Sequence, residues 1–273
     1  MEDIRKKPSF SLDDAASIAR EHFGIFGIAT QLPGERDQNF KITAKAGEFV
    51  IKISNPDLSV NVLALENAAI QIAGGLADTE PHAFEVPKLT RSKAGSTIVA
   101  VQSGDKQICQ VRCISFLKGV PLAEFEQHSP ALLRELGRQL GSLDKSLAAL
   151  NSSVAAQRDL QWDLLNAAEI VKRIGPNFED AEKRALLGTF ISHYQKIESR
   201  ISSLPRSVIH NDANDYNILV YQDGVTNQAL ISLIDFGDVL FSHTVFDLAI
   251  CAAYVILGKQ EPVEAMCELV AGY

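Results

Sequence analysis

Oxygen-bearing side chains gather in two short stretches that lie close together in the sequence. Residues 210–217 have the sequence HNDANDYN and lead directly into an apolar, β-like segment, 218–221. A second β-like segment ends in residues 234–238, with the sequence IDFGD. Between the two segments, Asp223-Gly224 is a turn signal. This part of the chain is therefore predicted to form an antiparallel β-hairpin.

The hairpin would bring Asn217 and Asp235 to one end, because Asn217 precedes its first strand and Asp235 closes its second. The backbones of paired strands lie roughly 5 Å apart. An amide oxygen and a carboxylate at that spacing suit Mg²⁺, a hard cation that also keeps water and binds phosphate oxygens. Asp212 lies on the loop that approaches this end and could accept a proton from a substrate hydroxyl. We therefore expect a Mg²⁺ site at Asn217 and Asp235, with Asp212 as the catalytic residue.

The elements that precede these stretches begin with an antiparallel sheet. Ser11 followed by Asp14 is typical of a helix N-terminus and predicts a helix to about Phe23. Apolar residues at helical spacing from 58 to 72 predict one further helix, inserted among the strands. The predicted strands cover residues 25–32, 39–44, 48–53, 96–101 and 107–116.

After Lys118-Gly119 the sequence pattern becomes helical. Leucines at helical spacing predict an amphipathic helix over 130–150. The segments 163–174 and 179–203, and the segment from Val245, are also predicted to be helices, with the hairpin inserted between them. The change of pattern near 117–122 divides the chain into an N-terminal β-rich lobe, residues 1–117, and a helical C-terminal lobe, residues 118–273.

The two polar stretches also carry a family resemblance. The pattern H-x-D-x-x-x-x-N, followed by D-F-G at the end of a strand, resembles the catalytic and metal-binding loops of protein-kinase-like enzymes. The wider sequence is similar to the aminoglycoside phosphotransferase and choline kinase family. GERDQNF at 34–40, IDFGD at 234–238 and FDLA at 246–249 most resemble hydroxylysine kinase-like enzymes and the kinase domain of class III aminotransferase fusions.

This resemblance implies an α+β fold of the protein-kinase-like, two-lobed kind. Its N-lobe would be an antiparallel β-sheet with one helix, and its C-lobe would be mostly α-helical. The N-terminal lobe would bind the nucleotide, and the C-terminal lobe would hold the catalytic hairpin.

A kinase-like N-lobe needs a strand lysine for the α- and β-phosphates and a helix carboxylate to orient it. Lys52 lies in the apolar strand FVIKI, and Glu66 is the one acid inside the following helical segment. Alone, each would be interpreted as a solvated surface residue. Because they occur in this order before the two catalytic stretches, the pair is expected to bind the nucleotide.

The loop that would cover the phosphates contains a single glycine, Gly34. Neither G-x-G-x-x-G nor the P-loop pattern G-x-x-x-x-G-K-[ST] occurs, which disfavours a P-loop NTPase. Backbone N–H groups of this loop could still face phosphates. Gly34 is therefore a candidate nucleotide-binding residue, and the choice between ATP and GTP stays open.

Further polar residues surround the expected reaction centre. Asp215 and Asp238 could neutralise an amino group of the substrate, or could simply be solvated. His210 is expected to brace the loop rather than transfer protons, and Asn214 is given no catalytic role. Asp247, at the position that anchors the catalytic loop in the resembled family, is expected to do so here by hydrogen bonding.

The motifs together predict a small-molecule kinase. It would transfer the γ-phosphate of ATP or GTP, with Mg²⁺, to the hydroxyl of an amine-bearing alcohol such as hydroxylysine or ethanolamine. One alternative is an aminoglycoside or other antibiotic phosphotransferase. A second alternative is a nucleotide-binding, non-catalytic module of a larger fused enzyme. No A-P-E-like segment follows D-F-G, which disfavours a protein substrate.

Charge and length bound the remaining possibilities. Lys and Arg number 26 and Asp and Glu number 34, which gives a net charge of −8 and argues against nonspecific binding of nucleic acid. The polar N-terminus and the short apolar run 245–257 predict a cytoplasmic protein that does not associate with a membrane. Because the resembled family usually has more helices after FDLA, the second lobe could be incomplete. The chain could then be a fragment of a longer enzyme, or its N-terminal domain in a fusion with a second enzyme domain.

Overall fold

The structure is a computed structural model that describes residues 7–76, 83–222 and 229–273. The chain divides into two compact units. Unit 1 comprises residues 1–125 and 218–234, and unit 2 comprises residues 126–217 and 235–273. The lobe boundary expected at 117/118 stays a prediction.

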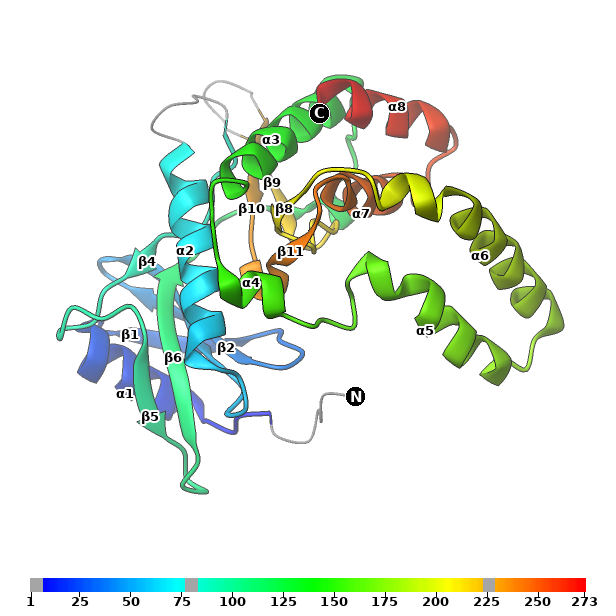
Figure 1. Cartoon of the computed structure of the whole chain (residues 1–273). Helices are drawn as coiled ribbons and strands as arrows, with labels where there is room; N and C mark the ends of the chain where they lie inside the picture. Colours follow the sequence, from blue (N-terminus) through cyan, green and yellow to red (C-terminus); the bar gives the residue numbers. More distant parts are fainter. Residues whose placement is uncertain (1–6, 77–82, 223–228) are drawn as a thin grey trace. The chain divides into compact units, whose positions relative to one another are not determined.

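Unit 1 is built on an antiparallel sheet (Figure 1). The strand order is β1-β2-β3-β6-β4, and β5 also pairs with β6. The three sequence-adjacent strands are joined by short turns, as predicted, and β6 then returns beside β3. The strands are β1 (Gly27–Leu32), β2 (Gln38–Ala44), β3 (Gly47–Ile53), β4 (Leu89–Thr90), β5 (Val99–Gln102) and β6 (Ile108–Ser115).

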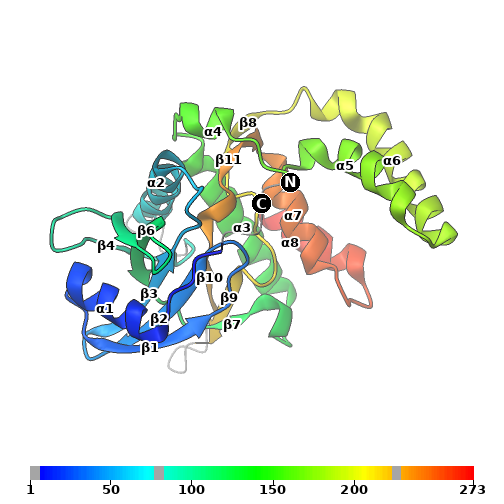
Figure 2. The same ribbon diagram turned by 90° about the horizontal axis from the view of Figure 1, so that it is seen from below.

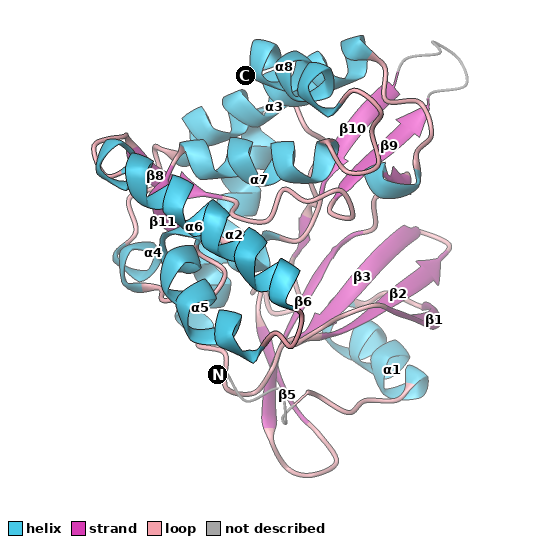
Figure 3. Ribbon diagram, turned by 90° about the vertical axis from the view of Figure 1, so that its right-hand side faces the viewer, coloured by secondary structure: helices cyan, strands magenta, loops and turns pink. Residues whose placement is uncertain are grey.

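Helix α1 (Leu12–Phe23) covers one face of this sheet (Figure 3). Ser11 and Asp14 form the predicted capping box, in which the Ser11 hydroxyl accepts from the Asp14 backbone and the Asp14 carboxylate accepts from the Ser11 backbone. Gly24 ends the helix in the left-handed conformation, with φ at 71°. The apolar side of α1 packs against alternate residues of β2, β3 and β6, which are buried with it in one core cluster: Phe40, Ile42, Ile51, Ile53, Val111 and Cys113.

The opposite face of the sheet carries polar residues, because successive side chains of a strand point to opposite faces. Asn39 of β2 is opposite Lys52 of β3, and Lys52 is opposite Arg112 of β6. Helix α2 (Val60–Leu76), the predicted inserted helix, reaches this face through Glu66, which contacts Arg112. One face of the sheet is therefore core, and the other presents charged groups.

The predicted hairpin consists of β9 (Ile218–Gln222) and β10 (Ala229–Leu233), with Ile218 paired to Leu233. The short strand β7 (Val120–Pro121) extends it to three strands, and this addition was not predicted. The expected turn at Asp223-Gly224 lies outside the described residues. Figure 2 shows β9 and β10 side by side.

Unit 2 is mostly helical, as the sequence predicted for this part of the chain (Figure 1). Helices α3 and α8 pack very closely, since a Cβ added to Gly137 would lie 2.0 Å from the Leu269 carbonyl oxygen. The short strands β8 and β11 pair in a two-stranded sheet that the sequence did not reveal. The elements are α3 (Pro130–Leu147), α4 (Ser153–Gln157), α5 (Ala167–Ile174), α6 (Ala181–Ile201), β8 (Arg206–Ile209), β11 (Leu240–His243), α7 (Val245–Val255) and α8 (Pro262–Gly272).

Among the described residues, no helix combines the length and the apolar character needed to cross a membrane.

Candidate active site

The loop after β8 is held by one buried carboxylate from α7. Asp247, which has no solvent exposure, accepts hydrogen bonds from the backbone N–H of His210 at 2.7 Å and of Asn211 at 2.6 Å. Asn211 has a φ of 65°, so the chain turns sharply at this point. Two charge-assisted bonds to successive amides fix the start of the loop. The anchoring role predicted for Asp247 is confirmed.

His210 braces the same loop from its buried position. Its Nδ1 accepts a hydrogen bond from the backbone N–H of Asp212 at 3.2 Å. Its ring lies edge-on to the ring of Phe236, with the ring centroids 4.7 Å apart. These contacts fix the path of the loop just before Asp212, which agrees with the bracing role predicted for His210.

Asp212 is oriented by two amide side chains that follow it in the loop. The Nδ2 of Asn214 donates to Asp212 Oδ1 at 2.8 Å, and the Nδ2 of Asn217 donates to Asp212 Oδ2 at 2.6 Å. The Oδ1 of Asn214 also accepts from the backbone N–H of Tyr216 and of Asn217, which closes the loop on itself. No catalytic role was predicted for Asn214, and the structure shows a positioning role that its spacing to Tyr216 and Asn217 could have indicated.

The pKa of Asp212 is raised to about 7, chiefly because burial disfavours the charged carboxylate. The nearby carboxylates of Asp238 and Asp235 raise the pKa further, while the hydrogen bonds from Asn214 and Asn217 lower it. A carboxylate with a pKa near neutrality is matched to general-base work at physiological pH. The arrangement can therefore orient a hydroxyl group and accept its proton.

Asn217 and Asp235 adjoin the two paired ends of the hairpin, as predicted. In the hairpin, Ile218 pairs with Leu233. Asn217 directly precedes Ile218, and Asp235 lies two residues after Leu233. Asp235 has a φ of 59°, and its Oδ1 accepts from the Gly237 backbone at 3.3 Å. Because the Nδ2 of Asn217 is committed to Asp212, its Oδ1 is the atom that could bind a cation.

These donors fit Mg²⁺, which takes one or two protein oxygens and completes its shell with water and phosphate. Within the described ranges, no three His, Cys, Asp or Glu side chains cluster closely enough to hold a metal ion by themselves. An amide and a carboxylate without further protein ligands are thus consistent with a cation that arrives with a phosphate group. The roles of Asn217 and Asp235 as metal ligands stay predictions.

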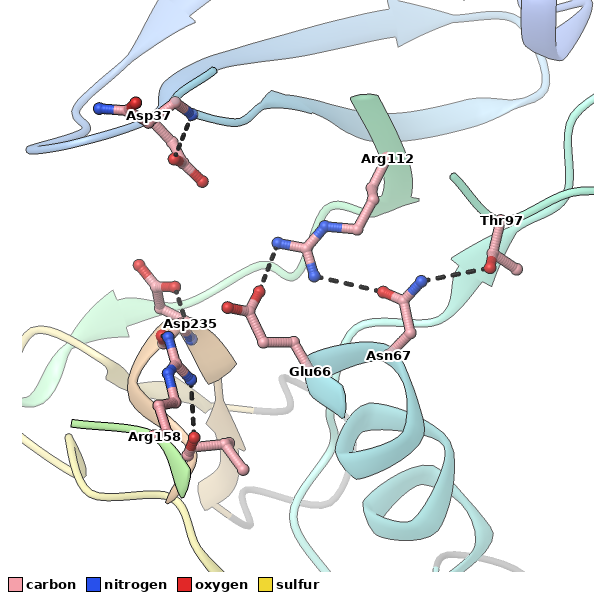
Figure 4. Close-up of polar contacts among 10 residues, drawn as sticks. Asp37, Glu66, Asn67, Thr97, Arg112, Arg158 and Asp235 are labelled. Carbon is pink, nitrogen blue, oxygen red and sulfur yellow. Dashed lines mark hydrogen bonds and ion pairs between the residues drawn. The ribbon is translucent and has the colours of Figure 1, made fainter. Parts of the chain in front are cut away.

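Arg158 fixes the segment that follows Asp235 (Figure 4). Its guanidinium donates to the carbonyl oxygen of Gly237 and to that of Val239, each at 2.6 Å. These two bonds hold the 3₁₀ turn Phe236–Asp238 beside Asp235. Sequence reasoning missed Arg158, because nothing local in the sequence connects it to a turn that far along the chain.

The two further carboxylates differ in their surroundings. Asp238 is 9% exposed and its charge raises the pKa of Asp212. Asp215 is partly buried, and this burial raises its own pKa, while the charge of His128 acts in the opposite direction. Of the two, Asp238 thus lies near enough to Asp212 for its charge to act on that carboxylate. Their role toward a substrate amine stays a prediction.

In unit 1, Glu66 forms a buried ion pair that the sequence did not reveal. The Nη2 of Arg112 lies 2.7 Å from Glu66 Oε2, and both side chains are almost fully buried. Lys52 is partly buried and lies directly opposite Arg112 across the β3–β6 pair. Lys52 and Glu66 thus belong to one charged face, in which Arg112 is a third member. Their nucleotide-binding roles stay predictions.

The Gly34 loop between β1 and β2 is ordered by its own neighbours. The Nδ2 of Asn39 donates to the Pro33 carbonyl at 2.9 Å, and Asp37 accepts from the Asn55 backbone at 3.1 Å. A Cβ at Gly34 would lie 2.5 Å from the Asp37 carbonyl oxygen and 2.8 Å from Asn39 Nδ2. Only glycine fits this turn, which explains the single glycine but does not test its proposed contact with phosphate.

A second carboxylate supports Asp247 from α3. Asp144 is 2% exposed, accepts from the Tyr273 hydroxyl at 2.6 Å, and lies close enough to Asp247 for the two carboxylates to interact. The pKa of Asp144 is raised well above its ordinary value, because of burial and the adjacent charge of Asp247. Asp247 accepts two backbone donors, and the raised pKa of Asp144 favours the protonated form of Asp144. Neither Asp144 nor Tyr273 was a sequence candidate.

Solved structures of small-molecule kinases share this fold over nearly the whole chain. The microcompartment-associated aminopropanol kinase matches with a TM-score of 0.70 at 19% identity, over 96% of this chain and 80% of that one. Amicoumacin kinase hAmiN, solved in complex with AMP-PNP, Ca²⁺ and Ami, matches with a TM-score of 0.68 at 14% identity, over 97% and 77% of the two chains. The α+β, protein-kinase-like fold predicted from the motifs is confirmed.

The family follows from the sequence itself. The model of the phosphotransferase enzyme family matches residues 28–271, and the chain belongs to this family. Hydroxylysine kinase of Mus musculus is 26% identical over 288 residues, which cover 98% of this chain and 75% of that relative. The predicted resemblance and the enzyme class, a phosphotransferase, are confirmed.

Proposed function

We propose that this phosphotransferase transfers the γ-phosphoryl group of ATP or GTP to the hydroxyl of an amino-alcohol, with hydroxylysine as the first candidate. The observation that carries the proposal is the environment of Asp212. Two amides orient its carboxylate, and its pKa of about 7 suits the transfer of a proton from an alcohol. Curated relatives named hydroxylysine kinase support the choice of acceptor.

In this proposal Asp212 accepts the hydrogen bond of the acceptor hydroxyl and takes its proton as the oxygen attacks the γ-phosphorus. The bond between the γ-phosphorus and the β,γ-bridging oxygen breaks in the same transfer, and ADP or GDP leaves. Asn214 and Asn217 keep the carboxylate in position throughout the step. Asp215 and Asp238 would attract the substrate amine through their charge. Most of the rate enhancement would come from positioning and from charge stabilisation, as in other phosphoryl transfers.

Lys52, steadied by Glu66, would bind the α- and β-phosphates, and backbone amides of the Gly34 loop would face them. Asn217 and Asp235 would hold Mg²⁺, which when bound would neutralise charge on the phosphates. The neighbour solved with AMP-PNP and Ca²⁺ supports a nucleotide and a divalent cation. We expect the reaction to take place in the cytoplasm.

A coupled assay of nucleotide consumption tests the proposal. The panel comprises hydroxylysine, ethanolamine, 1-amino-2-propanol and kanamycin, each with ATP and with GTP in the presence of Mg²⁺. Lysine, which lacks the hydroxyl of hydroxylysine, and 2-propanol, which lacks the amine of aminopropanol, are the matched controls. We expect turnover with at least one amino-alcohol and none with either control.

Two other outcomes would contradict the proposal. Turnover restricted to kanamycin would assign the chain to antibiotic phosphorylation. Binding of nucleotide without phosphorylation of any acceptor would favour a non-catalytic module.

A further inference from the structure

Arg112 occupies a position where a charged side chain is costly. It lies in the middle of β6 and is 2% exposed. Its Nη2 is 2.7 Å from Glu66 Oε2, and its Nη1 donates to Asn67 Oδ1 at 3.2 Å. Asn67 in turn donates to the Thr97 hydroxyl at 3.2 Å (Figure 4). Arg112 is thus locked to two consecutive residues of α2.

Stability alone does not account for this arrangement. Replacing a buried ion pair by apolar residues of similar volume is often neutral or stabilising. In addition, Lys52 lies directly opposite Arg112 in the β3–β6 register, so the two side chains leave the same face of the sheet. Like charges in directly opposite positions destabilise a sheet. The fold therefore keeps two cations in opposite positions beside one buried carboxylate, an arrangement that stability alone does not require.

The charges on this face indicate what the arrangement is for. Lys52 and Arg112 contribute two positive charges, and Glu66 contributes one negative charge. The excess positive charge suits the phosphates of a nucleotide. Because Arg112 holds one oxygen of Glu66, the carboxylate cannot turn freely, and its position relative to the Lys52 strand is fixed.

We propose that Arg112 is a positioning residue for phosphoryl transfer, which fixes the Glu66 carboxylate and thereby sets where the Lys52 ammonium group meets the nucleotide phosphates. This inference rests on the proposed kinase function. Without Arg112, the Glu66 carboxylate would lose a contact that fixes its position, and the Lys52 ammonium group that it orients would be placed less accurately. The nucleotide would then bind less tightly and in a less productive position.

A double-mutant cycle tests this role. Arg112→Met is expected to lower kcat/KM for the nucleotide by about 10- to 100-fold, the range found when the group that orients an active-site residue is lost. Glu66→Gln should have a similar effect, and the double variant should be no worse than Glu66→Gln alone. Arg91→Met, which changes an exposed arginine of the same unit, should leave kcat/KM unchanged.

An unchanged kcat/KM in folded Arg112→Met would overturn the proposal, as would losses that multiply in the double variant. Multiplying losses would mean that Arg112 acts independently of Glu66. If Arg112→Met does not fold, Arg112→Lys is the second variant. Arg112→Lys keeps the positive charge but cannot contact Glu66 and Asn67 at the same time as a guanidinium does. This variant should fold and should show an intermediate loss of kcat/KM.

Titration with Mg²⁺–AMP-PNP separates this inference from the proposed function. If the wild type binds the analogue but phosphorylates no alcohol, the kinase proposal fails. The double-mutant cycle is then evaluated from the dissociation constants of Mg²⁺–AMP-PNP. Weaker binding of this analogue to Arg112→Met, with unchanged binding to Arg91→Met, would still support the role of Arg112. If the wild type binds no analogue, both proposals are overturned.

Discussion

The side chain of Asn217 donates a hydrogen bond from Nδ2 to Asp212 Oδ2 at 2.6 Å. The amide expected to hold the cation therefore also orients the expected base. Asn217→Asp keeps an oxygen for the cation but replaces the donor by a second negative charge beside Asp212. We expect kcat to fall by about 100-fold, and saturating Mg²⁺ should not restore it, because the base itself is displaced.

The control for this variant is Asn166→Asp. Asn166 also donates through Nδ2, to the Leu160 carbonyl at 2.9 Å, but it lies outside the proposed machinery. It should lose stability while kcat stays unchanged. Full recovery of Asn217→Asp at high Mg²⁺ would mean that Asn217 serves only as a metal ligand.

The pH dependence of turnover reports on Asp212 directly. Only its deprotonated form can accept a proton, so kcat/KM for the acceptor should rise with pH and level off above about pH 7. Burial is the main cause of the raised pKa, and the charge of Asp238 adds to it. Asp238→Asn should therefore move the rise to lower pH at a fixed Mg²⁺ concentration. A rate that is flat between about pH 5 and about pH 8 would count against Asp212 as the base.

Local signals in the sequence predicted much of this structure. The Ser11–Asp14 capping box located α1, and the spacing of the two polar stretches located the hairpin and the residues at its end. The contacts that could not be predicted are made between residues that are distant in sequence. Arg112 acts on Glu66, and Arg158 acts on Gly237, and neither arginine has a local pattern that distinguishes it from a surface residue.

The proximity of Asp144 to Asp247 could not be predicted from the sequence, because the two residues are distant in the chain. If Asp144 is protonated, Asp144→Asn keeps a donor that can face Asp247 and an acceptor for Tyr273. We expect it to change the free energy of unfolding by less than about 1 kcal/mol, whereas Asp247→Ala strands two buried backbone donors and should cost about 2–5 kcal/mol. Denaturant unfolding measures both.

The sign of the pH effect follows from the raised pKa of Asp144. Above the ordinary carboxyl pKa of about 4, the native state binds a proton that the unfolded chain has released, so the stability contributed by this group falls as pH rises. Asp144→Asn should remove that dependence. If Asp144→Asn lowered the free energy of unfolding as much as Asp247→Ala does, Asp144 would have to be charged in the native state.

The contact between α3 and α8 depends on two glycines that allow close approach. A Cβ at Gly137 would lie 2.0 Å from the Leu269 carbonyl oxygen, and one at Gly272 would lie 1.9 Å from that of Arg134. Gly137→Ala should therefore destabilise the protein by about 1–3 kcal/mol in urea unfolding. Gly188→Ala, in helix α6, is the matched control, because no atom lies within 4 Å of its added Cβ. Alanine is also favoured over glycine inside a helix, by up to about 1 kcal/mol. Equal effects in the two variants would contradict the tight packing.

We propose phosphoryl transfer to the hydroxyl of an amino-alcohol, with Asp212 as the base. Its most direct test follows a radiolabelled γ-phosphate of ATP or GTP into hydroxylysine, with lysine as the acceptor that lacks the hydroxyl. We predict labelled phosphohydroxylysine with the wild type, none from lysine, and almost none with folded, nucleotide-binding Asp212→Asn. Equal labelling by wild type and Asp212→Asn, or label that reaches only water, would contradict the account.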